Sequence, residues 1–109
     1  MRQIELNNYR TMSGNTTSRV FTGRERGAEV RVQSGIDNLF SESEPLKVVI
    51  PDDVFSITPS FLEELFKNIV MRYGKETVLK NVKFTGKYRI RNAFDEAVNR
   101  IAQNQENGI

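Results

Sequence analysis

The strongest structural pattern in this sequence lies in residues 56–74, SITPSFLEELFKNIVMRYG. Its apolar residues are separated by steps that alternate between one and three positions, which places them on one stripe of an α-helix. The stripe consists of Phe61, Leu62, Leu65, Phe66, Ile69, Val70 and Tyr73, and the opposite side carries Glu63, Glu64, Lys67, Asn68 and Arg72. Gly74 follows where helices often end in a left-handed conformation. The sequence therefore predicts a long amphipathic helix whose apolar stripe the rest of the fold must cover.

The turn before this helix offers two candidate N-caps. Thr58 can be the cap with Pro59 at the first helical position, where a missing N–H is harmless. Alternatively, Ser60 is the cap and Glu63 completes an S-x-x-E capping box. In both interpretations a hydroxyl group lies beside free N–H groups and the positive end of the helix dipole, which tolerates a phosphate group. Ser60 is therefore a candidate cap and a candidate phosphoacceptor.

The composition excludes several kinds of chemistry. The chain has 109 residues and neither cysteine nor histidine, so disulfides, thiol catalysis, Ser-His-Asp chemistry and the usual zinc sites are excluded. We expect one domain over residues 1–109, with no catalytic activity and no cofactor. No apolar run approaches the ~20 residues of a membrane span, and residues 1–10 lack an apolar signal segment. A cytoplasmic protein that does not enter a membrane is the simplest expectation.

The remaining elements alternate between strands and helices. Strands are predicted at residues 2–6, at 46–50 with a continuation at 54–57, and at 77–85; a final helix follows from the spacing of apolar residues 90–101. Residues 46–50, LKVVI, are typical of a central strand that is buried on both faces. Residues 7–18 are expected to form a polar loop, so that residues 1–17 hold a strand and this loop, and residues 103–109 are expected to fray.

Residues 19–39 have two interpretations. Phe21, Ala28, Val32, Ile36 and Leu39 share one helical face, which favours a helix capped by Thr17 or Ser18. Three glycines oppose it at ~1 kcal/mol each, unless close packing against a sheet compensates; a hairpin through residues 23–27 is the alternative. With the helix, the chain is predicted to be α/β, with a small, mostly parallel sheet and three helices.

Three other clusters of polar or glycine residues are candidate sites. Asp52 and Asp53 are adjacent carboxylates, but neighbouring strand residues point in opposite directions, so a turn is favoured over a metal site. Glycines 23 and 27, beside the polar loop, match no nucleotide fingerprint. Five basic residues could contact phosphates or form a solvated face: Lys80, Lys83, Lys87, Arg89 and Arg91. An acidic block at residues 37–66, with seven acidic side chains and one basic, argues against a general nucleic-acid binder.

The segment VFSITPSFLEELF resembles the STAS-like domain proteins, a family of small bacterial chains. In that family an apolar strand runs into a V-x-F-I-T-P-S-F turn and an acidic helix rich in Leu and Phe. Residues 78–82 resemble its next strand, and residues 18–27 with Arg31 resemble its basic first helix. The resemblance covers roughly residues 18–102 and implies the fold of anti-sigma factor antagonists.

The resemblance also implies a function. In the antagonists, a serine at the start of the equivalent helix is phosphorylated by a partner, the anti-sigma factor, an ATPase of the histidine-kinase type. The equivalent residue here is Ser60, which implies a regulatory protein-interaction module switched by phosphorylation. The implied partner surface consists of Ile57, Thr58, Pro59, Ser60, Glu63, Glu64 and Lys67. The alternative is a small domain that binds nucleic acid or phosphate through the five basic residues between Lys80 and Arg91.

Overall fold

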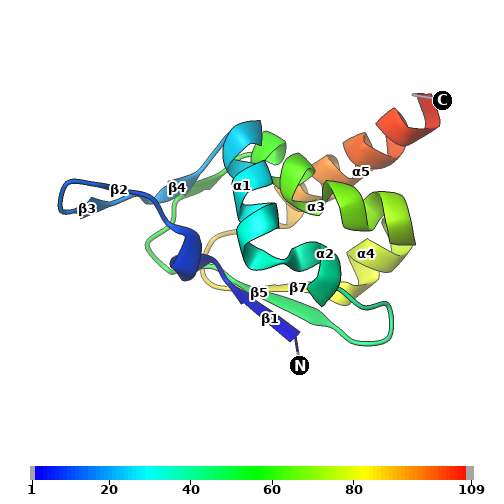
Figure 1. The fold of residues 1–109 in the computed structure, drawn as a ribbon, viewed down its shortest axis with the longest axis horizontal. Coiled ribbons are helices and arrows are strands. Elements are labelled where there is room, and N and C mark those ends of the chain that lie inside the picture. Colours follow the sequence, from blue (N-terminus) through cyan, green and yellow to red (C-terminus); the bar gives the residue numbers. More distant parts are fainter. Residues whose placement is uncertain (1, 108–109) are drawn as a thin grey trace.

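Three parallel strands form a sheet that is covered by helices on one face (Figure 1). The computed structural model describes residues 2–107. The strands of this sheet are β1 (Arg2–Glu5), β5 (Leu46–Val49) and β7 (Val82–Thr85), with β5 in the centre. In the register of the sheet, Ile4, Val48 and Phe84 lie side by side. The predicted α/β class and parallel sheet are confirmed.

The second face of the sheet is not covered, which corrects one prediction about β5. Leu46 and Val48 are buried, whereas Lys47 and Val49 are only half-buried. The strand therefore has the alternating burial of a sheet with one covered face, and not the two buried faces that the apolar run predicted. Lys47 lies beside Lys83 of β7 on the uncovered face.

The long helix α3 (Pro59–Tyr73) is the centre of the helical layer and packs against both α1 (Arg24–Ser34) and α5 (Arg91–Asn107). Its predicted apolar stripe is buried, except that Tyr73 is half-buried. Phe66 meets Phe84 of β7 and Phe94 of α5 edge to face, with ring centroids 6.3 and 4.9 Å apart. At Gly74, with φ of 91°, the chain turns directly into α4 (Lys75–Asn81).

The segment of residues 19–39 begins with a strand and contains two helices, α1 and α2 (Ile36–Leu39). The helix interpretation is right in kind, but α1 begins at Arg24 and is not capped by Thr17 or Ser18. Its buried face is also different, because Gly27 and Val30 are buried while Val32 is exposed. A Cβ atom on Gly27 would lie 2.3 Å from the carbonyl oxygen of Phe61, so the missing side chain allows α1 to approach α3. The predicted close packing is therefore against a helix and not against a sheet.

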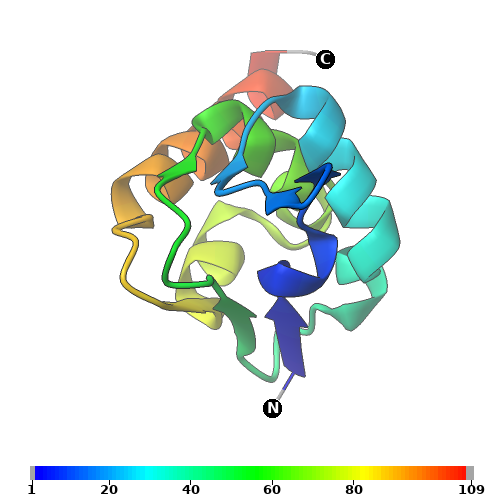
Figure 2. The ribbon, with the colours of Figure 1, turned by 90° about the vertical axis from the view of Figure 1, so that its left-hand side faces the viewer.

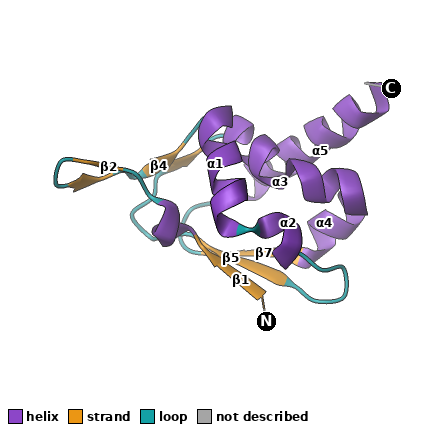
Figure 3. Ribbon diagram, viewed as in Figure 1, coloured by secondary structure: helices purple, strands orange, loops and turns teal. Residues whose placement is uncertain are grey.

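Two other predicted boundaries are wrong, and the predicted polar loop contains secondary structure. Residues 77–81 belong to α4, so that β7 starts only at Val82. Helix α5 continues through residues 103–107, where fraying was predicted; residues 108 and 109 lie outside the described residues. The predicted polar loop contains a 3-10 turn, η1 (Leu6–Tyr9), and a hairpin of β2 (Met12–Ser13) and β3 (Thr16–Thr17), which projects from the body (Figure 3).

A second, shorter parallel pair positions the start of α3. It consists of β4 (Val20–Phe21) and β6 (Ser56–Ile57), which lie side by side in Figure 2. The amide of Thr58 donates to the carbonyl of Phe21, so the pairing extends to the N-cap of α3. Among residues 2–107, none of the helices combines the length and apolar character that crossing a membrane requires.

Candidate functional site

Thr58 is the N-cap of α3, which resolves the two interpretations of this turn. Its hydroxyl oxygen accepts a hydrogen bond from the amide of Phe61 at 3.3 Å, and Pro59 occupies the first helical position. The same oxygen accepts from the amide of Gly23 at 3.1 Å. Thr58 therefore caps α3 and also ties the start of α1 to the start of α3.

Ser60 lies one position beyond Pro59 and is not the cap. Its Oγ is 3.1 Å from Oγ1 of Thr58, and its side chain is half-buried. This is the one hydrogen bond of the Ser60 hydroxyl within residues 2–107. The capping box does not form, because the carboxylate of Glu63 pairs with Arg24 and Arg100 instead of the backbone at the start of α3. The hydroxyl of Ser60 is therefore not required to satisfy a backbone N–H at this helix start.

Ile57 does not belong to the predicted partner surface, because it is 2 % exposed. Its amide donates to the hydroxyl oxygen of Tyr88 at 3.2 Å, and the Tyr88 hydroxyl donates to its carbonyl at 3.4 Å. In a parallel pair a residue such as Ile57 directs both backbone groups away from its partner strand. Tyr88, from the loop before α5, thus satisfies the outer edge of β6 and holds the turn in place.

Glu63 is also buried, which corrects its assignment to the polar side of α3. It is 4 % exposed, and its carboxylate is 3.2 Å from Arg24 of α1 and 3.3 Å from Arg100 of α5. A buried carboxylate is stable only when it is paired in this way. Glu63 therefore connects three helices, and its charge is not presented to a partner.

Glu64 lies next to Glu63 and has its own pair of arginines. Its carboxylate is 3.6 Å from Arg31 and 4.0 Å from Arg24. Arg31 also donates to the backbone carbonyl of Glu64 at 2.6 Å. Arg24 is thus shared between the two glutamates, and each glutamate has a second arginine. Sequence reasoning missed these three arginines as partners of the glutamates, because the pairing depends on how α1, α3 and α5 pack.

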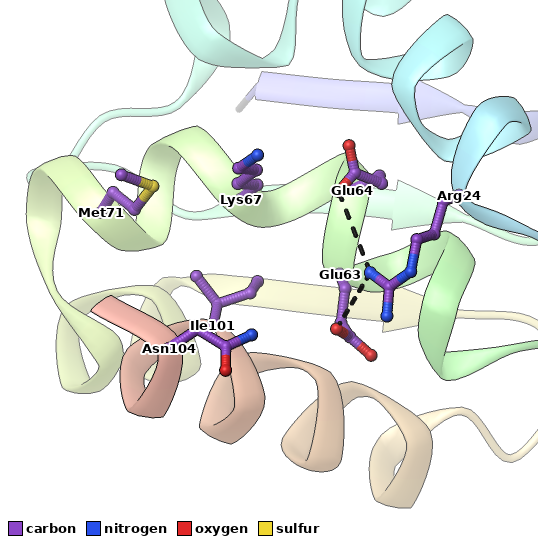
Figure 4. A pocket seen from close by; sticks show the side chains of 7 residues that line it. All are labelled: Arg24, Glu63, Glu64, Lys67, Met71, Ile101 and Asn104. Atoms are coloured by element: carbon purple, nitrogen blue, oxygen red, sulfur yellow. Dashed lines mark ion pairs between the residues drawn. The ribbon is translucent and has the colours of Figure 1, made fainter. Parts of the chain in front are cut away.

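A groove runs along α3 beyond these charges (Figure 4). It has a volume of about 420 Å³ and is lined by Arg24, Glu63, Glu64, Lys67, Met71, Ile101 and Asn104. We call it the α3 groove. Ser60, Glu64, Lys67 and Met71 are spaced by four, three and four residues, so they follow one line along the helix surface. The groove therefore continues the line that begins at Ser60.

The other candidate carboxylates are turn residues. Asp52 is exposed, and Asp53 accepts two hydrogen bonds from Arg10, at 2.9 Å to Oδ1 and 2.7 Å to Oδ2. Arg10 also donates twice to the carbonyl of Ser18, at 3.0 and 2.9 Å. No group of three acidic side chains that could hold a metal ion occurs within the part of the chain that the structure describes. Both aspartates thus lie in a turn, as the turn interpretation predicted, and Asp53 anchors it.

Asp53 gives a prediction about acid stability. Hydrogen bonds from Arg10 lower the pKa of Asp53 below its ordinary value, while in the unfolded chain an aspartate titrates near about 3.9. The stabilisation is therefore present above about pH 4 and is lost as the pH falls through the lower folded pKa. We expect Asp53→Asn to lower the melting temperature at neutral pH and to flatten its fall in acid, as measured by circular dichroism from about pH 7 to about pH 2. Asp52→Asn, the matched control, should leave the profile unchanged; equal profiles for both variants would contradict the role of Arg10.

The five basic candidate residues are spread over three elements. Lys80 lies on α4, Lys83 on β7, and Lys87 and Arg89 in the loop that follows; all four are exposed. Arg91 begins α5, where it pairs with Asp95 at 3.4 Å and donates to the carbonyl of Leu79. Lys83, Arg89 and Arg91 are brought together around a second hollow of about 550 Å³. Arg91 is thus partly committed to the fold.

Comparison with known proteins identifies one family. Searches among curated proteins and among solved structures gave no match. A model of the STAS-like domain of unknown function (DUF4325) matches residues 52–87, which contain β6, the Thr58–Ser60 turn, α3, α4 and β7. The resemblance predicted from the sequence is thereby confirmed for residues 52–87, where this chain is similar to the STAS-like family; the rest of residues 18–102 lies outside the match.

Proposed function

We propose that this protein is a regulatory protein-interaction module that binds a partner along α3 and is switched by phosphorylation of Ser60. One observation carries the proposal: Thr58 is the N-cap, so the hydroxyl of Ser60 is left without a backbone N–H to satisfy. Modification of Ser60 therefore does not remove the hydroxyl that caps α3. The STAS-like match of residues 52–87, which includes this turn, supports the same assignment.

The partner surface that we propose follows the line from Ser60 into the α3 groove. Thr58, Pro59 and Ser60 are half-buried at its start, and Glu64 and Lys67 follow. At the other end Met71 is 47 % exposed and lines the groove. Ile57 lies beneath this surface and does not belong to it, whereas Glu63 lines the groove but is only 4 % exposed.

The partner class that we propose is a histidine-kinase-type ATPase, on the basis of the STAS-like resemblance. Such a partner would transfer the γ-phosphoryl group of ATP to Oγ of Ser60, releasing ADP, with the hydroxyl proton passing to a base or to solvent. The phosphate adds about −1.5 to −2 charge at neutral pH beside the carboxylates of α3. It should therefore weaken binding to an acidic partner surface. In this role the protein binds and releases a partner and catalyses no reaction itself.

The test is affinity capture from a lysate of the native host, followed by phosphorylation in vitro. We expect wild-type protein and Ser60→Ala to retain an ATPase of this type and Ser60→Glu to lose it. With ATP, the purified ATPase should add one phosphate to wild type and none to Ser60→Ala, measured by mass spectrometry. Ser43→Glu, a matched charge change in the exposed loop before β5, is the control. Equal retention by Ser60→Glu, with no phosphate on Ser60, would contradict the switch.

A second candidate function is supported by a different observation. Lys47 and Lys83 lie side by side on the uncovered face of the sheet, and like charges in such positions repel each other unless an anion lies nearby. With Lys87 and Arg89 they would form a surface for the phosphates of a nucleic acid. Binding that falls steeply with salt concentration and is lost in Lys83→Glu would support it; a flat salt response would exclude it.

A further inference from the structure

Arg24 lies where the starts of α1 and α3 meet. It is the first residue of α1 and follows Gly23, whose amide donates to Oγ1 of Thr58. The same Oγ1 is 3.1 Å from Oγ of Ser60. One hydroxyl group thus connects the backbone next to Arg24 with the side chain of Ser60.

Both glutamates that pair with Arg24 also pair with a second arginine, so the ion pairs of Arg24 can be replaced. Its side chain is 59 % exposed, and both of its carboxylate partners are held by a second arginine. Glu63 is paired with Arg100, and Glu64 is paired with Arg31, whose side chain is only 18 % exposed. The guanidinium of Arg24 can therefore leave both glutamates while the buried carboxylate of Glu63 keeps a cationic partner.

We propose that Arg24 binds the phosphate group of phosphorylated Ser60. To do so, its guanidinium group leaves the carboxylates of Glu63 and Glu64. The inference rests on the proposed function, in which Ser60 is the phosphoacceptor. Ser60 precedes Glu63 and Glu64 by three and four residues, so its Cβ lies about 5–6 Å from theirs on the helix surface. Arg24, which contacts both glutamates, is therefore close to Ser60. A guanidinium group binds a phosphate through two parallel hydrogen bonds. The carboxylate of Glu64, 4.0 Å from Arg24, is too distant to form such bonds.

The exchange changes the α3 groove as well as the turn. Arg24, Glu63 and Glu64 line the same end of the groove, and Arg24 lies between the two carboxylates in Figure 4. When Arg24 moves to the phosphate, this end of the groove loses a positive charge. Phosphorylation at Ser60 is thus transmitted to side chains one helical turn away without any movement of the backbone.

The test uses full-length protein with phosphoserine incorporated at position 60 during translation. The readout is the second pKa of the phosphate, followed by phosphorus NMR in the parent protein and in Arg24→Gln, Arg24→Lys and Arg72→Gln. A free phosphoserine titrates near about 6, and a nearby guanidinium lowers this value because it favours the dianion. We expect Arg24→Gln to raise the pKa by about 0.5 units or more, Arg24→Lys to raise it less, and Arg72→Gln to leave it unchanged.

Arg72→Gln is a matched control because it removes an exposed arginine of α3 that lies twelve residues from Ser60, at the other end of the helix. If Arg24→Gln leaves the pKa of the phosphate unchanged, or if Arg72→Gln raises it equally, Arg24 does not bind the phosphate. Circular dichroism of each variant verifies the fold, and Arg24→Lys retains the charge should the glutamine variant unfold. Since the phosphate is introduced without any kinase or partner, this result is independent of whether the captured ATPase modifies Ser60. Failure of the inference and failure of the proposed function are therefore separate outcomes.

Discussion

Replacing Phe66 by alanine is expected to lower the free energy of unfolding by about 3–5 kcal/mol. The ring is fully buried and touches the rings of Phe84 and Phe94, which also meet each other with centroids 4.9 Å apart. These three rings join α3, β7 and α5. Truncation would leave a cavity at the junction of the sheet and the helical layer, and the surrounding backbone cannot close it without moving a helix.

Urea denaturation of Phe66→Ala and Phe55→Ala measures this effect against a matched control. Phe55 is 65 % exposed and its ring contacts the guanidinium of Arg19 at 5.8 Å. The same truncation there should change the free energy of unfolding by about 1 kcal/mol or less. If Phe66→Ala lowers the free energy of unfolding by less than about 1 kcal/mol, the side of α3 that carries Phe66 does not face the core.

Gly27→Ala is the second change with a large expected effect. The new Cβ would lie 2.3 Å from the carbonyl oxygen of Phe61 and 2.9 Å from Cβ of Glu64, so α1 must move away from α3. We expect a loss of about 2–3 kcal/mol in the free energy of unfolding. The direction is informative, because alanine in a helix interior is intrinsically favoured over glycine by about 1 kcal/mol.

The measurement is again urea denaturation, with Gln33→Ala as the control. Gln33 is exposed on the same helix, so its replacement should have little effect on stability. A more stable Gly27→Ala protein would mean that the two helices are not in backbone contact at this position.

Local chemistry was sufficient to predict α3 and to limit its cap to Thr58 or Ser60, of which the structure shows Thr58. Thr58 and Pro59 specify the start of a helix through a side-chain acceptor and a fixed φ angle, and both act within four residues. The stripe that includes Phe66 also needs no knowledge of the rest of the chain, because any partner layer buries the same face. For the same reason the STAS-like turn and its candidate serine were found from the sequence.

The surroundings of Glu63 could not be predicted in this way. Its position on the helical wheel is polar, but α3 is covered on two sides, by α1 and by α5. Two arginines that are distant in the sequence, Arg24 and Arg100, make its burial possible. Which cations reach a carboxylate depends on how three helices cross, and single-helix periodicity contains no information about that.

The two wrong assignments of α1 and α4 have related causes. Val32 was expected to face the core, but the helix is rotated so that Gly27 approaches α3. Residues 77–81 form part of helix α4 despite the β-propensity of Thr77 and Val78. Val78 is the residue of this helix that is buried in the core. Propensities of about 1 kcal/mol are easily outweighed by packing of this kind.

The connectivity of the parallel sheet has a consequence for the rate of folding. Each of its strands, β1, β5 and β7, comes from a different third of the chain, so no two of them can pair through a local turn. Sheets that depend on such distant contacts form slowly, because the loop-closure entropy is lost before the pairing compensates for it. We therefore expect the helices to collect around α3 before the strands pair. During that interval β5, the most apolar strand of this sheet, is unpaired on both edges. Refolding at high protein concentration should therefore cause aggregation through β5.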